Sequence, residues 1–203
     1  MKKTLYLMRH GQTLFNIRGK IQGWVDSPLT EEGIRQAGYA KRYFEDHRIT
    51  FDYAYSSTSE RASDTLELVT EMPYTRLKGI KEMNHGMFEG ESEQLHPPFW
   101  FDPSHPERDR RADYYVTFGG ESSSQLLERM IKTLTEIMAR EGHETVLVVS
   151  HIGAMANFLM HVAPAFKMRE PGGFMFTNCC ILKLEFEDGK FTFIEGIEHD
   201  FAK

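Results

Sequence analysis

The fold is decided by the stretch Leu5-Tyr6-Leu7-Met8-Arg9-His10-Gly11-Gln12-Thr13, in which four apolar residues run directly into a cation and an imidazole. The apolar run predicts a short buried strand, which the glycine and polar residues end abruptly. We therefore expect Arg9 and His10 at the carboxyl end of a strand, where ligand crevices form in open α/β sheets. Taken alone, the pair also has a plainer explanation: an arginine paired with a carboxylate, and a histidine that fills a turn.

Composition sets the broad class of protein. A chain of 203 residues suits a single domain, residues 1–203, with room for a small inserted cap. The formal charge of −6 and the lack of a basic run argue against a nucleic-acid partner. We expect a cytoplasmic protein without a membrane partner, because the sequence shows no signal peptide and no membrane span. Adjacent Cys179 and Cys180 suit a disulfide poorly, so we expect two small core residues of a late strand.

Strand-like and helix-like segments alternate along the rest of the chain. Helices are predicted over 31–46, from a capping box at 57–60 onward, from a second capping box at 122–125 to about Gly142, and over 154–162. Strands are predicted over 4–8, 51–55, 75–80, 145–149, 181–186 and 191–194, the last two forming a hairpin through Asp188-Gly189. In the first helix, Ile34, Ala37, Ala40 and Phe44 recur at helical spacing. Residues 14–29 are expected to form an irregular loop over His10. The alternation predicts an α/β fold, a three-layer α/β/α sandwich with a mostly parallel mixed sheet.

Residues 91–120 are expected to form a cap or lid inserted in this domain. The segment contains four prolines and many aromatic residues, and a structureless loop of this length in a compact domain is usually functional. Its aromatic residues include Phe99, Trp100, Phe101, Tyr114, Tyr115 and Phe118. The same residues could also pack a satellite core, which is compatible with a lid.

Two of the predicted strands are each followed by a histidine. Neighbouring parallel strands would bring His10 and His151 into one crevice, where Arg9 and Arg61 would add two guanidinium groups. A neutral imidazole is a competent nucleophile toward phosphorus, and guanidinium groups bind phosphate oxygens bidentately. A metal site is not expected, because zinc normally takes three His, Cys or carboxylate ligands and two nearby cations oppose a divalent ion. The cluster therefore predicts a phosphate site.

These residues belong to an ordered set that resembles the histidine phosphatase superfamily, in the branch of cofactor-dependent phosphoglycerate mutases and broad-specificity phosphatases. In chain order, the matching segments are Leu7–Thr13 with its Arg-His-Gly motif, Asn16, Gln22–Gly33, Ser56–Thr65, Glu82, Gly119–Ser122 and Val149–His151. An isolated Arg-His-Gly motif would be a weak signal, whereas this order is specific. The resemblance covers most of the chain apart from the cap and the tail, and it implies a phosphoglycerate mutase-like fold.

The resemblance implies covalent catalysis. His10 would attack the phosphorus in line and form a phosphohistidine. Arg9, Arg61 and His151 would bind the three equatorial oxygens as their charge shifts in the transition state. Glu82 would protonate the leaving alcohol and then, as a carboxylate, activate the water that hydrolyses the intermediate. Without the resemblance, Glu82 would be taken for a solvated surface acid.

Further contacts to phosphate and substrate follow by the same analogy. Asn16 is assigned to phosphate and Gln22 and Gly23 to substrate, although Asn16 could be a turn former and Gln22 a polar loop residue. Relatives commonly have glycine after the second histidine, with its backbone N–H facing the phosphate. Ile152 takes that place here, which keeps the amide and makes the pocket wall bulkier. His85, in a segment where relatives often show Phe-Gly-x-Trp-Glu-Gly, is either a substrate contact or a surface histidine.

These expectations favour a metal-independent phosphomonoesterase that acts on a small phosphorylated metabolite and needs no cofactor. The alternative is a cofactor-dependent phosphoglycerate mutase, which would need a 2,3-bisphosphoglycerate primer; the short cap and the few extra basic residues count against it. A non-catalytic phospho-ligand binder is a third hypothesis, although every expected catalytic residue is present. The sequence leaves open the physiological substrate and whether the chain forms a homodimer.

Overall fold

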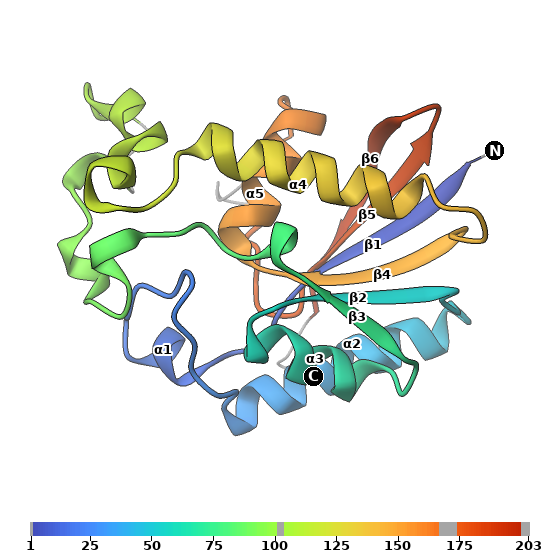
Figure 1. Ribbon diagram of the computed structural model, residues 1–203. Helices are drawn as coiled ribbons and strands as arrows, with labels where there is room; N and C mark the ends of the chain where they lie inside the picture. The colour runs from blue at the N-terminus through green and yellow to red at the C-terminus, as the bar shows by residue number, and fades with distance from the viewer. Residues whose placement is uncertain (1, 101–103, 167–173, 200–203) are drawn as a thin grey trace.

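The computed structural model describes residues 2–100, 104–166 and 174–199. A six-stranded sheet forms its centre, in the order β3-β2-β4-β1-β5-β6 (Figure 1). The strands are β1 (Lys3–Arg9), β2 (Tyr53–Ser57), β3 (Tyr74–Leu77), β4 (Thr145–Ser150), β5 (Ile181–Glu187) and β6 (Lys190–Ile197). The first four pair in parallel, while β5 and β6 pair antiparallel. The predicted mixed, mostly parallel sheet is confirmed.

Two helices cover each face of this sheet. α2 (Glu31–Asp46) and α3 (Glu60–Val69) pack together on one face, and α4 (Ser123–Met138) and α5 (Ile152–Val162) pack together on the other (Figure 1). A fifth, short helix, α1 (Leu14–Ile17), lies outside these layers. The fold is therefore the predicted three-layer α/β/α sandwich.

Residues of the central strands alternate between two apolar cores. In β1, Leu5 and Leu7 pack under α4 and α5. Tyr6 and Met8 point the other way and pack under α2 and α3. Both faces of the strand are buried, which explains why its sequence is a continuous apolar run rather than an alternating one.

Local capping fixes the start of two helices. Thr30 caps α2 by accepting a hydrogen bond from the Gly33 amide, and α2 has the predicted bounds. Ser122 and Gln125 form the predicted capping box of α4, which ends before the expected Gly142. Ile34, a member of the predicted apolar spacing, is 49% exposed, whereas Ala37, Ala40 and Phe44 are buried.

The predicted capping box at the start of α3 is wrong. Within the described part of the chain, Ser59 is the N-cap but makes no capping bond through its side chain. The Asp26 carboxylate instead accepts a 2.5 Å hydrogen bond from the Glu60 amide. A residue distant in sequence thus replaces the local cap, and the Ser57 hydroxyl contacts His151 in the site described below.

Three other expectations are corrected. Residues 14–29 are not wholly irregular, because Thr13 and Asn16 form a capping box that starts α1. β2 begins at Tyr53 rather than at residue 51. β3 ends at Leu77, and a 3₁₀ turn over Lys78–Ile80 follows. At Gly79 a Cβ atom would lie 1.9 Å from Thr133 Oγ1, so the chain turns where its backbone presses against α4.

The C-terminal hairpin forms as predicted. Asp188 and Gly189 both have positive φ, 51° and 78°, as a two-residue hairpin turn requires. Cys179 and Cys180 are buried free thiols, but they precede β5 instead of lying in it.

Four short 3₁₀ helices make up most of the predicted cap, at Glu93–Leu95, Pro98–Trp100, Arg108–Ala112 and Tyr114–Phe118. Trp100 and Tyr115 are buried and join the core under α4 and α5. Phe101 and Pro103 lie outside the described residues. These aromatic side chains therefore pack as a core extension, and the role of residues 91–120 as a lid stays a prediction.

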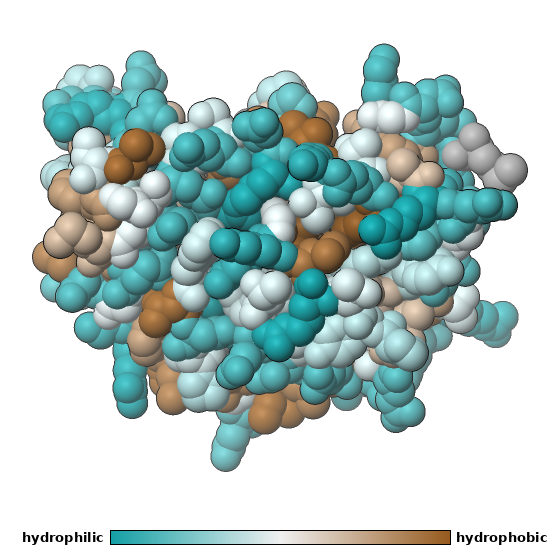
Figure 2. All heavy atoms as spheres, viewed as in Figure 1, coloured by the Kyte–Doolittle hydropathy of each residue, from teal (hydrophilic) through white to brown (hydrophobic). Residues whose placement is uncertain are grey.

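Figure 2 shows that the face viewed in Figure 1 is mainly hydrophilic, with apolar side chains in small separate patches. Within the described ranges, no helix has the length and apolar character needed to cross a membrane.

Candidate active site

The two histidines meet because their strands are neighbours. β1 and β4 pair in parallel register up to Arg9 opposite Ser150, and His10 and His151 follow directly. Their ring centroids lie 5.2 Å apart. Both side chains are closed off from solvent, with exposures of 3% and 0%. The predicted crevice at the carboxyl ends of the strands brings the two imidazoles together.

His10 is held as a neutral ring with one nitrogen available. Its Nδ1 lies 2.7 Å from the Gly11 carbonyl oxygen. Because a carbonyl only accepts hydrogen bonds, we assign the proton to Nδ1 and the lone pair to Nε2. Burial, and then the charges of Arg61 and Arg9, hold the pKa of His10 well below its usual value. The arrangement suits a nucleophile.

The glycine after His10 is required by close packing. A Cβ atom on Gly11 would lie 2.6 Å from the Gly33 carbonyl oxygen. The Gly11 amide donates to Thr65 Oγ1 at 3.0 Å, and that hydroxyl donates to the Arg61 carbonyl at 2.7 Å. These contacts tie the end of β1 to α2 and α3.

Arg61 is fully buried in the first turn of α3. Its Nη1 donates to the Val25 carbonyl at 3.0 Å and to Asp26 Oδ1 at 2.9 Å, and its Nη2 donates to the Gly23 carbonyl at 2.8 Å. Among the described residues, its Nε has no hydrogen-bond partner. A buried N–H without a partner is costly, so this edge of the guanidinium suits an anionic ligand.

His151 offers a second donor without a partner. Its Nε2 lies 2.7 Å from Ser57 Oγ, which accepts a bond from the Ser59 amide and so has its own proton to donate. Nδ1 then carries the ring proton, and it finds no acceptor in the part of the chain that the structure describes. Burial, followed by the charge of Arg61, keeps the pKa of His151 well below its usual value.

Arg9 directly precedes His10 at the end of β1. It is half-buried, and its Nη1 donates to the Phe176 carbonyl at 2.5 Å. Its charge contributes to the lowered pKa of His10, so the guanidinium lies close to the nucleophile. The four residues expected to handle phosphate are thus brought together.

Glu82 is buried, 4% exposed, so the alternative of a surface acid is wrong. Its Oε1 accepts from the Met83 and Ala154 amides at 2.8 and 2.9 Å, and its Oε2 accepts from the Gly153 amide at 2.8 Å. It therefore caps α5, where helix amides lack internal partners. Burial raises the pKa of Glu82, while these amides and the Arg61 charge oppose the rise.

The residues predicted to contact phosphate and substrate make hydrogen bonds within the protein. Asn16 accepts from the Thr13 amide, as a turn former would. Gln22 accepts from the Thr13 hydroxyl at 2.7 Å and donates to Ser27 Oγ at 3.0 Å. Ile152 begins α5 directly after the second histidine, and the next two amides are taken by the acid. Ligand contacts for these residues, and for Gly23, stay predictions.

Sequence reasoning missed Glu89, whose carboxylate organises the loop around Arg61. It accepts from the amides of Gly23, Trp24 and Val25 at 3.2, 2.8 and 2.8 Å. Glu89 and Gly90 match the last two residues of the Phe-Gly-x-Trp-Glu-Gly segment of relatives. This match is the sequence signal that could have identified Glu89.

His85 is not a surface histidine. It is 9% exposed and its ring lies 4.6 Å from that of Tyr115 in an edge-on contact. Burial, and then the charge of Arg61, lower the pKa of His85 to about 4. Whether it touches substrate stays a prediction.

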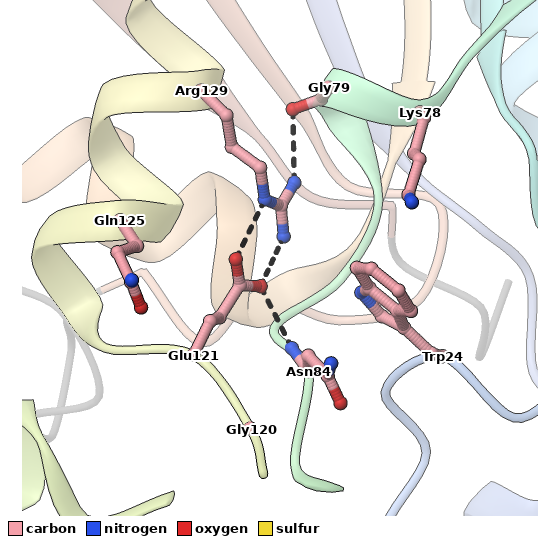
Figure 3. Close-up of a pocket in the computed structure, with 8 residues that line it drawn as sticks. All are labelled: Trp24, Lys78, Gly79, Asn84, Gly120, Glu121, Gln125 and Arg129. Carbon is pink, nitrogen blue, oxygen red and sulfur yellow. Dashed lines mark hydrogen bonds and ion pairs between the residues drawn. The ribbon is translucent and has the colours of Figure 1, made fainter. Parts of the chain in front are cut away.

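An open cavity of about 480 Å³ lies between α4 and the segment after β3 (Figure 3). It is lined by Trp24, Lys78, Gly79, Asn84, Gly120, Glu121, Gln125 and Arg129. Trp24 Nε1 and Arg129 Nη2 both donate to the Glu82 carbonyl, at 3.0 and 2.8 Å. Two residues of the cavity lining therefore contact the main chain of Glu82.

Over the residues whose placement is known, no three His, Cys, Asp or Glu side chains gather in a way that could hold a metal ion.

Comparisons with known proteins agree with this geometry. The model of the histidine phosphatase superfamily (branch 1) matches residues 5–196. A 2,3-bisphosphoglycerate-dependent phosphoglycerate mutase from Xylella fastidiosa (strain M12) is 30% identical over 183 residues, covering 74% of each chain. A metal-independent phosphoserine phosphatase from Arabidopsis thaliana is 28% identical over 173 residues, covering 79% of this chain and 69% of that one. The crystal structure of a phosphoglycerate mutase from Bacillus anthracis str. Sterne matches with a TM-score of 0.79 at 28% identity, covering 95% of this chain and 92% of that chain.

Proposed function

The chain belongs to the histidine phosphatase superfamily, and we propose that it is a metal-independent phosphomonoesterase that acts through a phosphohistidine on His10. One observation carries the proposal. The free Nε2 of a neutral His10 lies in a closed site with two buried groups, Arg61 Nε and His151 Nδ1, which have no partner among the described residues. The oxygens of a phosphoryl group accept hydrogen bonds from Arg61 Nε and His151 Nδ1, and its phosphorus is the electrophile for His10 Nε2.

The first half-reaction transfers the phosphoryl group to the enzyme. His10 Nε2 forms a bond to phosphorus as the ester P–O bond breaks, and Arg9, Arg61 and His151 hold the three equatorial oxygens. The leaving alkoxide takes a proton from Glu82. Since Oε1 accepts two amide bonds and Oε2 only one, Oε2 is the oxygen with room to carry that proton.

The second half-reaction returns the enzyme to its starting state. Water attacks phosphorus, the bond to His10 Nε2 breaks, and inorganic phosphate leaves. The Glu82 carboxylate takes a proton from the attacking water and is again the acid. Burial, which raises the pKa of Glu82, helps one group serve in both protonation states.

A phosphoglycerate mutase is the second candidate, and one observation favours it. The ammonium groups of Lys78 and Lys81 lie 4.6 and 5.0 Å from the ring centroid of Trp24, next to the chain that carries Glu82. A mutase substrate has a second anionic group for such cations to bind. For the phosphatase we propose a small phosphorylated metabolite and no cofactor; a bisphosphoglycerate primer enters only with the mutase reaction.

Hydrolysis of a generic aryl phosphate in excess chelator tests the proposal. We expect phosphate release by the wild type and by His161→Ala, an exposed control on α5, and none by His10→Ala. Loss of activity on chelation would contradict metal independence. Rapid isomerisation of 3-phosphoglycerate only with the bisphosphate primer, without hydrolysis, would favour the mutase instead.

A further inference from the structure

We propose that Arg129, paired with Glu121, is a positioning residue that sets the main chain of Glu82 for proton transfer to the leaving group. This inference rests on the proposed function, in which Glu82 is the acid. The two residues lie on and just before α4, far in sequence from the segment that they hold.

All five N–H groups of the Arg129 guanidinium are engaged. Nη1 donates to the Gly79 and Lys81 carbonyls at 3.0 and 2.7 Å, and Nη2 donates to the Glu82 carbonyl at 2.8 Å. The remaining two bonds go to the Glu121 carboxylate, from Nη2 at 2.5 Å and from Nε at 2.9 Å. Figure 3 shows this guanidinium between α4 and the segment after β3. An arginine has no further donor to offer.

Glu121 binds the same segment two residues after Glu82, at Asn84. Its Oε1 accepts from the Asn84 amide at 2.8 Å, and its own amide donates to the Asn84 carbonyl at 2.9 Å. The side chains of the Arg129–Glu121 pair are only 20% and 13% exposed. Breaking a pair this buried leaves a charge and several carbonyls without partners, which is costly.

Arg129 contacts the main-chain carbonyl of Glu82 and not its side-chain carboxyl. The carboxyl lies at the start of α5, whereas the carbonyl of the same residue is held by α4 through Arg129 and by Trp24 Nε1. The groups expected to bind phosphate lie on other elements. Loss of Arg129 should therefore impair proton transfer more than phosphate binding.

This expectation separates a positioning role from a merely structural one. An aryl phosphate with a good leaving group needs little protonation, whereas an alkyl phosphate with a poor one needs the acid. For Arg129→Ala we expect kcat/KM for the alkyl ester to fall about tenfold further than for the aryl ester, a fraction of the effect of a general acid. Glu82→Gln should show the same selectivity more strongly. Lys132→Ala, an exposed control on the same helix, should leave both rates unchanged.

The cavity offers a second readout. Because Arg129 lines an open space of about 480 Å³, ethylguanidinium has access to the position that Arg129→Ala vacates. We expect it to restore hydrolysis of the alkyl ester in this variant and not in Glu82→Gln. Arg129→Lys, which keeps the charge but not the fork, serves as a milder variant should the alanine variant not fold.

Equal losses on both esters, or selectivity in Glu82→Gln but not in Arg129→Ala and Arg129→Lys, would overturn the positioning role and leave the proposed function standing. A wild type that hydrolyses neither ester would overturn the proposed function, and this inference with it.

Discussion

Gly153, near the start of α5, lies against the side chain of Glu82. A Cβ atom there would lie 2.5 Å from Glu82 Oε1, the far end of a flexible side chain. The fold can yield at this point by moving Glu82, so a substitution should act on the chemistry rather than on folding.

For Gly153→Ala we expect kcat/KM for an alkyl phosphate to fall by about tenfold or more, since a general acid typically contributes about 10²–10⁴. Thermal stability should change little, because alanine favours the helix by about 0.5–1 kcal/mol and offsets part of the lost contacts. The matched control is Gly38→Ala in α2, where a Cβ atom meets nothing within 4 Å. It should keep full activity; an active Gly153→Ala enzyme would argue against the acid role of Glu82.

At this scale the sequence could place His10, Arg61 and His151, because each stands at a strand end or a helix start within a motif. Glu82 could be found only by resemblance, because two of the amides that bind its carboxylate belong to α5, 71 and 72 residues later in the chain. Glu89 and Arg129 were not foreseen, since most of their partners are backbone groups, whose positions the sequence does not reveal.

Among the elements, the loop that holds Arg61 depends on one carboxylate. Glu89 accepts from three consecutive amides of this loop and from the His85 amide at 2.9 Å. The loop carbonyls of Gly23 and Val25 in turn hold the guanidinium. A change at Glu89 should therefore reach the phosphate site through the position of this loop.

For Glu89→Gln we expect inhibition by inorganic phosphate to weaken about tenfold and the free energy of unfolding to drop by about 2 kcal/mol, the typical loss for buried hydrogen bonds to a charged group. Phosphate inhibition constants and urea unfolding measure the two effects. Glu91→Gln, at an exposed position nearby, is the control. Unchanged phosphate affinity in Glu89→Gln would show that Arg61 does not need this loop.

The starts of two long helices were predictable from local caps, whereas the cap of α3 was not. α2 and α4 begin at Thr30 and Ser122, whose side chains cap their own helices. α3 is capped at Glu60 by Asp26, and no local pattern reveals such a tertiary cap.

Burial lowers the pKa values of several histidines across the molecule. The pKa values of His10 and His151 lie well below the ordinary range, and burial lowers those of His85 and His96 to about 4. In the unfolded chain all four regain an ordinary pKa near 6.5. Below that pH the unfolded state takes up protons that the folded state does not, so stability falls as the pH falls.

We expect the free energy of unfolding to decrease by several kcal/mol between about pH 7 and pH 5, at up to about 1.4 kcal/mol per pH unit for each such histidine. The raised pKa values of Glu82 and Asp64 act in the opposite direction, but the histidines outnumber them. Urea unfolding over a pH series measures the slope. His85→Phe should reduce it and His161→Ala should not; a stability that is flat or rises toward pH 5 would contradict the burial of neutral rings.

The central claim is that His10 carries the phosphoryl group, and rapid chemical quenching tests it most directly. The enzyme is mixed with an aryl phosphate in excess chelator, quenched in alkali, where phosphohistidine is stable, and mapped by peptide mass spectrometry. The account predicts a phosphorylated imidazole on His10 that forms before steady-state turnover and is absent from His10→Ala. Steady hydrolysis with no phosphorylated peptide, or with the label on another residue, would contradict it.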